Sequence, residues 1–445
     1  MAVSKKKPTT KTAGKTNTHP SAAGKPGKSK YLILRLLGPG LVTGAADDDP
    51  SGIATYSQAG AQFGYGLLWT VFLTTPFMIA IQLVSAKIGR VTGKGIIGNL
   101  MQVVPRWVVL LLVALLLAAN IFNIAADMAA MGEALSLVIG GLNHEHALIF
   151  AAASVLLQVF VPYSRYAPVL KFATLILFLY VATAFTVKIP WGQALTAMVM
   201  PKISLDADYL MMVVAVLGTT ISPYLFFWQA SQEVEEMHQG RETPALRDAP
   251  RAGKVEMKRI TFDTTAGMLM SNTVAFFIIL TTAAVLNAHG IKEIHSAADA
   301  ANALKPLAGE LTFFLFALGI IGTGMLAIPV LAGSAAYCVA ATMGWRGSLE
   351  AKAFEAKGFY GIVAASTIVG FALTFTPFDP MKMLVWSAVL NGVVAVPVMV
   401  AMMLIVTDKK TMKMFAATRA LSITGWAATA AMLIAILALG ATSLF

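Results

Sequence analysis

Long apolar segments recur along the 445-residue chain, separated by short polar stretches. A bilayer core of about 30 Å is crossed by a helix of roughly 20 apolar residues. The segments are continuous and rich in Leu, Ala, Ile, Val and Met, whereas the strands of a membrane β-barrel alternate apolar and polar residues. The pattern therefore predicts an all-α membrane protein. Eleven membrane helices are expected, at about residues 34–62, 64–86, 107–133, 146–163, 168–186, 207–236, 261–287, 309–342, 359–376, 380–406 and 420–442.

Composition supports a chain whose main solvent is the lipid bilayer. It is 57% hydrophobic and 12% charged, whereas about 25% of the residues of a soluble domain are charged. The net charge of +11 does not indicate nucleic-acid binding, because the Lys and Arg residues gather at helix ends and in the first 30 residues. We expect a disordered basic tail over 1–30 and one transmembrane domain over 31–445. No feature of the sequence specifies an oligomeric state.

The basic residues alternate between successive loops. Lys87, Arg90, Lys94 and Arg106 lie between the second and third predicted helices, whereas the next loop, 142–146, contains no Lys or Arg. Positive residues favour the cytoplasmic side of a membrane. The alternation predicts a multi-pass protein of the cytoplasmic membrane, with its N-terminus inside and its C-terminus outside.

Two predicted helices contain residues that interrupt a helix. The first includes the run from Gly44 to Gly52, with Pro50, and the sixth includes Gly218 and Pro223. Both lie at the start of a five-helix block, and the blocks enter the membrane from opposite sides. This layout is typical of transporters with inverted repeats and a binding site at two broken helices. We expect repeat one at about 34–186, repeat two at about 207–406 and an extra helix at about 420–442.

The first break carries three consecutive acids, Asp47, Asp48 and Asp49, with no Lys or Arg between Leu36 and Ala86. Charges at the bilayer centre are costly, and a bound metal ion with carboxylate and carbonyl ligands is the simplest compensation. The alternative is a water-exposed helix end.

At the second break, the Ser222 hydroxyl and the carbonyls of Thr219 and Thr220 are candidate ligands. A proline kink stabilised by Ser/Thr hydrogen bonds to the helix backbone explains these residues equally well.

Other acids and amides mark the third and sixth predicted helices. Asp127, Asn120 and Asn123 share one helix face. We favour a polar path over interhelical hydrogen bonding, because a carboxylate is costly for bonding alone. The acids at the end of the sixth helix have two readings, a cation-attracting inner mouth or a solvated helix end, and we favour the solvated end. These acids are Glu233, Glu235 and Glu236.

The two breaks resemble those of the NRAMP family of divalent metal transporters, which have Asp-Pro-Gly-Asn in the first helix and Met-Pro-His in the sixth. The corresponding residues here are Asp49-Pro50-Ser51-Gly52 and Ser222-Pro223-Tyr224, and Gly38-Pro39-Gly40 also matches. The resemblance implies a LeuT-like fold with metal ligands at Asp49 and the carbonyl of Ala46. The family's asparagine and methionine ligands are replaced by Gly52 and Ser222.

These departures favour a harder ion than the family's usual cargo. Loss of a thioether removes the bias toward soft transition metals, and a wider, oxygen-lined site suits partly hydrated Mg²⁺. The pattern resembles the magnesium-transporting branch of the family, with Mn²⁺ as a second cargo.

Proton coupling is expected to be weak or absent. The family's second acid in the third helix is missing after Asp127. Tyr224, whose phenol has an ordinary pKa of about 10, replaces the histidine. The alternative is a proton-coupled Mn²⁺/Fe²⁺ importer of the same family.

Two more distant readings are disfavoured. An amino-acid transporter would meet repulsion between its substrate carboxylate and the three aspartates, and a magnesium-dependent prenyltransferase would need a second Asp-rich motif. We therefore expect no enzyme and no cofactor, with the metal ion as cargo.

Overall fold

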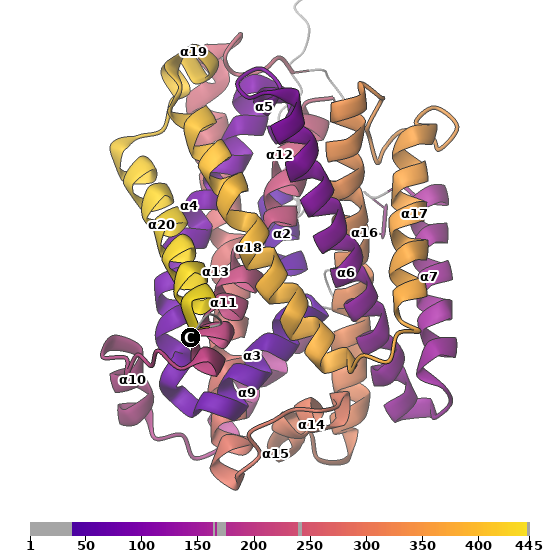
Figure 1. Ribbon diagram of the computed structural model, residues 1–445, viewed down its shortest axis with the longest axis vertical. Coiled ribbons are helices and arrows are strands. Elements are labelled where there is room, and N and C mark those ends of the chain that lie inside the picture. The colour runs from indigo at the N-terminus through magenta and orange to yellow at the C-terminus, as the bar shows by residue number, and fades with distance from the viewer. Residues whose placement is uncertain (1–37, 163–164, 167–174, 239–242, 443–445) are drawn as a thin grey trace, which may run out of the picture. The chain divides into compact units, whose positions relative to one another are not determined.

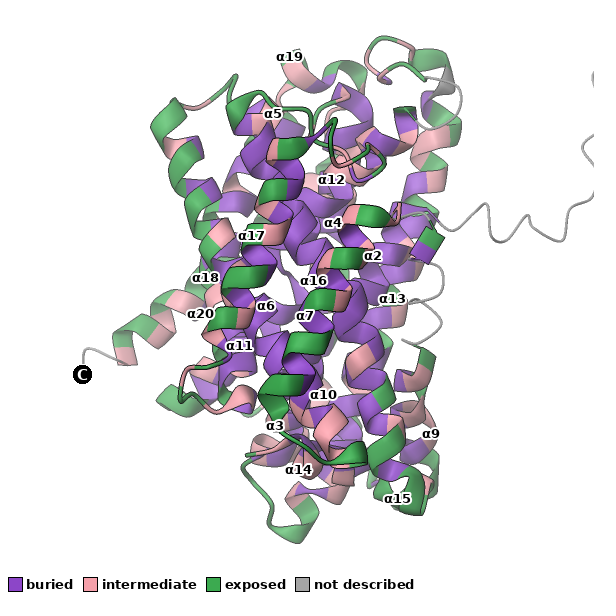
Figure 2. Cartoon of the chain, turned by 90° about the vertical axis from the view of Figure 1, so that its right-hand side faces the viewer, coloured by how far each residue is buried: buried purple, intermediate pink, exposed green. Residues whose placement is uncertain are grey.

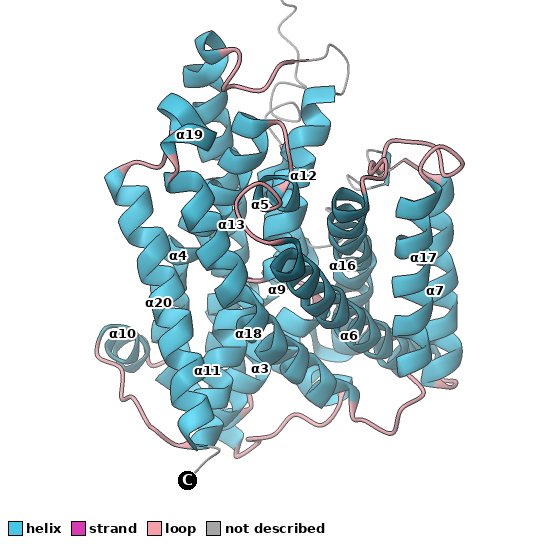
Figure 3. Ribbon diagram, turned by 45° about the horizontal axis from the view of Figure 1, so that its top comes forward, coloured by secondary structure: helices cyan, strands magenta, loops and turns pink. Residues whose placement is uncertain are grey.

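The computed structural model describes residues 38–162, 165–166, 175–238 and 243–442. In these ranges the regular elements are helices, and no strand is present (Figure 3). The predicted basic tail, 1–30, lies outside the described residues, as do the first residues of the first and fifth predicted helices.

Each predicted membrane segment has a helical counterpart, and both predicted breaks are present. The helices are α2 (Pro39–Asp47) and α3 (Pro50–Phe63), α4 (Leu68–Thr92), α6 (Arg106–Ile139), α7 (Asn143–Phe160), α9 (Phe178–Thr186), α11 (Ala207–Thr220) and α12 (Pro223–His238), α13 (Gly253–Val285), α16 (Thr312–Met343), α17 (Lys357–Leu373), α18 (Pro380–Thr407) and α20 (Arg419–Thr442).

A count of membrane spans that uses only helix length and composition is smaller than the number of predicted membrane helices. Among the described residues, seven stretches are long and apolar enough to cross a membrane, or eight if the bent pair Leu175–Thr186 and Trp191–Val199 is one span. The difference arises because α3 and α4 form one continuous stretch, α7 begins with polar residues, and α17 has only 17 residues.

Several short helices were not predicted. They are α5 (Ile96–Leu100), α10 (Trp191–Val199), α14 (Ala297–Ala301), α15 (Lys305–Ala308) and α19 (Lys409–Met412). In Figure 1, α5 and α19 lie at the top, and α10, α14 and α15 lie at the bottom. We call the top the basic end, because α4, α12, α16 and α18 end there in Lys- and Arg-rich connections.

The two broken helices run in opposite directions. The backbone N–H groups of Gly38 and Gly40, at the start of α2, donate to the Asp263 carboxylate at 3.0 and 2.7 Å. Glu233, near the end of α12, forms an ion pair with Arg259 at 2.9 Å. Arg259 and Asp263 lie within the first three turns of α13, so α2 starts at the basic end and α12 finishes there. This is the inverted arrangement that the sequence predicts.

Burial separates an interior from an apolar outer surface. Figure 2 shows buried residues along α2, α4, α13 and α16 and exposed ones along the outer faces of α7 and α17. Large apolar side chains are exposed on the outer helices, including Leu148 and Phe160 of α7, Ile368 of α17 and Leu437 of α20. An exposed apolar surface of this kind suits contact with lipid.

The acidic end of α12 differs from the prediction of a solvated helix end. The Glu233 side chain is fully buried and pairs with Arg259. Glu235 is 9% exposed, and its carboxylate accepts hydrogen bonds from the Tyr337 hydroxyl at 2.5 Å and the Leu349 backbone N–H at 2.9 Å. The solvated-end prediction was wrong for these two residues, because the Arg259 side chain of α13 and the Tyr337 side chain of α16 reach the end of α12.

Glycines bring α2 into backbone contact with α13. A Cβ atom at Gly44 would lie 2.3 Å from the Gly267 carbonyl oxygen, and one at Gly267 would lie 2.3 Å from the Gly40 carbonyl oxygen. Any larger residue must separate the two helices. This contact sets the position of α13 relative to α2. It therefore determines which residues of α13 after Gly267 face the C-terminal end of α2.

We expect Gly44→Ala to destabilise the protein by about 1–3 kcal/mol, because the added methyl group overpacks the α2–α13 contact. Gly361→Ala is the matched control: Gly361 also lies within a helix, but nothing lies within 4 Å of its added Cβ, so helix propensity makes that change neutral or stabilising. Thermal unfolding of the detergent-solubilised variants measures the difference. Equal melting temperatures would contradict the close contact.

Candidate metal site

The first break results from the position of Asp49 before a proline. Proline disfavours the helical conformation in the residue that precedes it, and Asp49 has φ −70° and ψ 170°. Asp49 then caps α3: its Oδ1 atom accepts hydrogen bonds from the Gly52 backbone N–H at 2.8 Å and the Ser51 hydroxyl at 2.9 Å. One carboxylate oxygen therefore holds the start of α3.

The second oxygen of Asp49 faces residues from two other helices. Its Oδ2 atom accepts hydrogen bonds from the Tyr224 hydroxyl of α12 at 3.0 Å and the Asn123 amide of α6 at 3.1 Å. The Tyr224 hydroxyl is also 3.3 Å from the carbonyl oxygen of Ala46. The Asp49 carboxylate and the Ala46 carbonyl, the two ligands implied by the family resemblance, thus face the same point.

The Asn123 side chain is itself held in place. The Ser387 hydroxyl of α18 donates to Asn123 Oδ1 at 2.6 Å. Because the oxygen side of the amide accepts from Ser387, its NH₂ group faces Asp49. Ser387 was not identified from the sequence, since only helix packing brings α18 beside α6.

The second break lies beside the first. Ser222 donates its hydroxyl hydrogen to the backbone carbonyls of Gly218 and Thr219, each at 2.8 Å, as the proline-kink alternative describes. Its oxygen lone pairs remain able to contact a ligand. A Cβ atom at Gly52 would lie 3.3 Å from the Thr219 hydroxyl oxygen, so Gly52 and Thr219 are neighbours across the two breaks.

Asp47 and Asp48 face a different helix from Asp49. The Ser271 hydroxyl of α13 lies 2.6 Å from Asp47 Oδ2 and 3.0 Å from Asp48 Oδ1. One hydroxyl has one hydrogen and can satisfy only one of these carboxylates, while Asp47 Oδ1 is buried without a hydrogen-bond partner. Asp47 Oδ2, Asp48 Oδ1 and the Ser271 hydroxyl oxygen therefore lie close together, and the Ser271 hydrogen alone does not offset the negative charge of the two carboxylates. Ser271 was also missed from the sequence, because no local motif links it to the aspartates.

The acids at the break are buried. Asp47, Asp48 and Asp49 are 0%, 3% and 1% exposed, which does not fit a water-exposed helix end. Within the described part of the chain, no ion pair involves them, and no three His, Cys, Asp or Glu side chains form a metal-binding group. A metal ion at this break would therefore depend on carbonyl, hydroxyl and water oxygens in addition to carboxylates.

The three polar residues on one face of α6 lie in three different environments. Asn123 contacts Asp49, whereas the Asn120 amide donates to α16, at the Leu331 carbonyl and the Ser334 hydroxyl, both at 2.8 Å. Asp127 is fully buried near the backbone N–H of Ser51, and neither of its carboxylate oxygens makes a hydrogen bond of standard geometry. Asn123 therefore bonds Asp49 directly, Asp127 lies beside the break near Ser51, and Asn120 bonds α16 instead.

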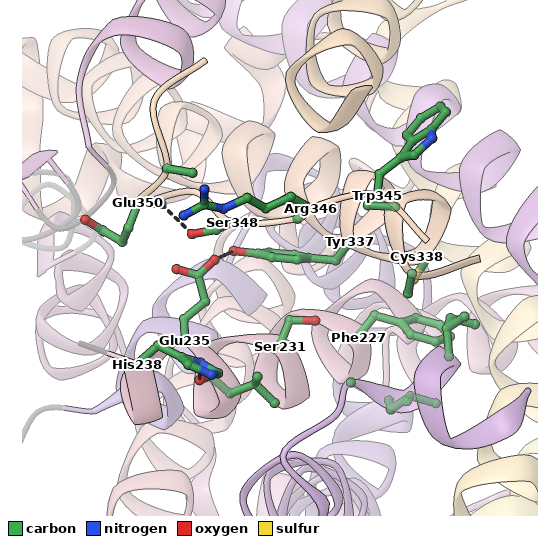
Figure 4. A pocket seen from close by; sticks show the side chains of 18 of the residues that line it. Phe227, Ser231, Glu235, His238, Tyr337, Cys338, Trp345, Arg346, Ser348 and Glu350 are labelled. Atoms are coloured by element: carbon green, nitrogen blue, oxygen red, sulfur yellow. Dashed lines mark hydrogen bonds between the residues drawn. The ribbon is translucent and has the colours of Figure 1, made fainter. Parts of the chain in front are cut away.

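Two cavities lie on either side of the break. Toward the opposite end, a cavity of about 230 Å³ is lined by Ala54 and Gln58 of α3, among others. Toward the basic end, a cavity of about 720 Å³ is lined by residues of α5, α12 and α16 (Figure 4). Asp49 and Tyr224 line neither cavity and are each 1% exposed, so the site is closed on both sides.

Sequence comparison matches the chain to one family model and to relatives named divalent metal cation transporter. Residues 40–442 match the family model described as "Natural resistance-associated macrophage protein-like". The chain is 30% identical over 305 residues to the divalent metal cation transporter MntH of Pectobacterium carotovorum subsp. carotovorum (strain PC1), a match covering 67% of this chain and 70% of that protein. It is 29% identical over 304 residues to the protein of the same name from Yersinia pestis (strain Pestoides F), covering 66% and 70%.

Solved structures share the fold at low sequence identity. A manganese transporter from Eremococcus coleocola, in complex with an aromatic bis-isothiourea substituted compound, matches with a TM-score of 0.74 and 16% identity, covering 94% of this chain and 89% of that one. MhsT in complex with L-phenylalanine matches with a TM-score of 0.59 and 13% identity, covering 91% and 98%. These likenesses confirm the LeuT-like fold. Because the family model spans nearly all of the membrane region, the chain belongs to the Nramp family.

Proposed function

We propose that this protein transports divalent metal cations, chiefly Mg²⁺ and also Mn²⁺, into the cell across the cytoplasmic membrane by alternating access. The observation that carries the proposal is the convergence of the Asp49 carboxylate and the Ala46 carbonyl on one buried point, between two cavities. The relatives named divalent metal cation transporter support the class of cargo.

The selectivity proposal rests on the donor atoms at the break. The candidate ligands Asp49, Ala46, Ser222 and Thr219 all offer oxygen, with Asp47 and Asp48 nearby. Oxygen donors suit hard cations such as Mg²⁺ and Mn²⁺. Gly52 lies close to two further oxygen atoms, since a Cβ atom there would lie 3.1 Å from the Asp47 carbonyl oxygen and 3.3 Å from the Thr219 hydroxyl oxygen. Residue 52 therefore adds no side chain that would compete with water for a bound ion. Such a site suits a cation that keeps some of its water molecules when it binds.

Uptake without protons is the second part of the proposal. The side chains that bond Asp49 are Tyr224, Asn123 and Ser51, and none of these residue types exchanges protons near neutral pH. The basic end faces the cytoplasm in this proposal, so an inside-negative potential drives the ion inward. The gain is roughly 4.6 kcal/mol per 100 mV for a divalent ion.

A proton-coupled Mn²⁺ or Fe²⁺ importer is the second candidate. Two observations favour it: the Eremococcus coleocola structure is of a manganese transporter, and the buried Asp127 carboxylate has no hydrogen bond of standard geometry. A buried carboxylate of this kind suits a proton-carrying residue.

Uptake into proteoliposomes separates the two candidates. We expect Mg²⁺ to enter under an inside-negative potential without internal acidification, and Asp49→Ala to abolish entry because it removes the charged ligand. Asp248→Ala, which removes an exposed carboxylate at the basic end, is the control and keeps wild-type entry. An internal metal dye and a pH dye follow both events. Mn²⁺ entry that ignores excess Mg²⁺ and carries protons inward would support the second candidate instead.

Asn123→Ala should weaken metal binding by about 10–100-fold, because residues that orient a ligand affect affinity to this extent. Asn120→Ala removes the same amide one turn away, where it bonds only α16, and should leave affinity unchanged. Isothermal titration of the purified variants with Mn²⁺ gives both dissociation constants. Equal affinities for the two variants would show that Asn123 does not orient Asp49.

Ser222→Met should shift selectivity toward soft ions. A thioether at the second break favours Cd²⁺ over Mg²⁺, whereas Ser222→Leu adds similar bulk without sulfur. We expect competition of Cd²⁺ against Mg²⁺ uptake to strengthen in Ser222→Met alone. The same strengthening in Ser222→Leu would mean that size rather than sulfur governs the choice, and would contradict a ligand position at residue 222.

A further inference from the structure

The cavity at the basic end shares a helix face with the site. Tyr224, which contacts Asp49, begins a face of α12 that continues through Phe227, Ser231, Glu235 and His238 at three- and four-residue intervals. Residues at this spacing lie on one side of a helix. All four residues after Tyr224 line the cavity of about 720 Å³, and Figure 4 shows them in a row along α12.

The far side of the cavity is formed by α16 and the connection that follows it. Tyr337 and Cys338 of α16 and Trp345, Arg346 and Ser348 of the connection line it. Trp345 is 47% exposed, so the cavity reaches solvent at the basic end. Its wall is fixed to α12 by hydrogen bonds. The Glu235 carboxylate accepts from the Tyr337 hydroxyl and from the Leu349 backbone N–H, at 2.5 and 2.9 Å.

Along α12, Phe227 comes after Tyr224 at the break and before the other residues of this helix that line the cavity. Its side chain is 2% exposed, and it is the cavity-lining residue of α12 nearest to Tyr224, one helical turn away. On the cavity side, the next residue of the same face is Ser231, which is partly exposed. Along this face Tyr224 and Phe227 are buried, Ser231 is partly exposed, Glu235 is buried under its hydrogen bonds, and His238 at the end is exposed.

We propose that the Phe227 ring is the barrier between the Asp49 site and this cavity, which in the proposed transport function is the cytoplasmic vestibule through which the divalent cation leaves. The proposal rests on the proposed transport function, and it adds the residue that closes the exit route. An aromatic ring has no donor atoms for a hydrated cation, so the ion cannot pass until the ring moves.

The polar lining suits such a route. Ser231, Glu235 and Glu350 offer oxygen atoms along it, and carboxylates in a cleft raise the local concentration of cations. Two basic residues, Arg346 and Lys352, also line the cavity. Arg346 is paired with Glu355 at 3.3 Å, and the carboxylates of the lining outnumber these two basic groups. A cation leaving the break would meet carboxylates before reaching the solvent.

Cysteine accessibility tests both parts of the proposal without any metal. The only cysteine of the chain, Cys338, lines the cavity and is first replaced by alanine. Single cysteines are then placed on the two sides of the ring, as Ser231→Cys and Ser222→Cys. A membrane-impermeant, positively charged methanethiosulfonate is added to one side of oriented vesicles, and the rate of modification is measured.

We expect Ser231→Cys to react from the cytoplasmic side and Ser222→Cys to react at least about tenfold more slowly from that side. Adding Phe227→Ala should raise the Ser222→Cys rate by about tenfold or more and leave the Ser231→Cys rate nearly unchanged. Phe226→Ala removes the same ring at a buried position that does not line the cavity, and should not raise it.

If Ser231→Cys reacts from the external side alone, the cavity does not open to the cytoplasm, and the proposal is wrong. A Ser222→Cys rate that matches that of Ser231→Cys while Phe227 is present, or that does not respond to Phe227→Ala, would overturn the barrier. If size-exclusion chromatography shows that Phe227→Ala is misfolded, the comparison of the two cysteines with Phe227 intact still decides. Because no metal is present, a failure here is distinguishable from a failure of Mg²⁺ uptake.

Discussion

The burial of three consecutive carboxylates at the first helix break is the constraint on which the rest of the structure depends. Asp47, Asp48 and Asp49 are almost completely buried, and each charge at the middle of a membrane costs about 2.5–3.5 kcal/mol on insertion scales. No ion pair among the described residues offsets that cost. Their surroundings supply hydrogen bonds from three directions: the start of α3, the α6–α12 side at Asp49, and Ser271 of α13. Those bonds leave the negative charge uncompensated, which makes the break attractive to a cation.

The packing of the helices follows from this requirement. The glycine contact between α2 and α13 places Ser271, one turn after Gly267, beside the first two aspartates. The inverted direction of the second repeat places Tyr224, near the start of α12, against Asp49 and the Ala46 carbonyl. Both helices thus break at the same buried point. From this point α3 leads to the smaller cavity and α12 leads to the larger one. A site closed on both sides between two cavities corresponds to an occluded state of the alternating-access cycle proposed above.

The sequence predicts the parts of this account that depend on local pattern. Apolar length predicts the helices, and Pro50 and Pro223 predict the two breaks because each stands among glycines and polar residues. Proline alone is a weaker signal, since Pro76, Pro329 and Pro397 lie inside the continuous helices α4, α16 and α18. Contacts between distant segments are not encoded in any local pattern. Ser271 and Ser387 are ordinary polar residues of apolar helices until packing places them beside Asp48 and Asn123. The same limit explains the wrong expectation for the end of α12, whose acids resemble a solvated terminus in the sequence and are covered by α13 and α16 in the fold.

The central claim is that a divalent cation binds at the first break, between the Ala46 carbonyl and the Asp49 carboxylate. Crystals grown with Mn²⁺ and measured at a wavelength where manganese scatters anomalously locate the ion directly. The account predicts one anomalous peak within coordination distance, about 2.0–2.6 Å for hard cations, of Asp49 Oδ2, with the Tyr224 hydroxyl moved away from it. A peak confined to the Glu235 cavity, or to the surface, with the Asp49–Tyr224 hydrogen bond intact, would contradict it.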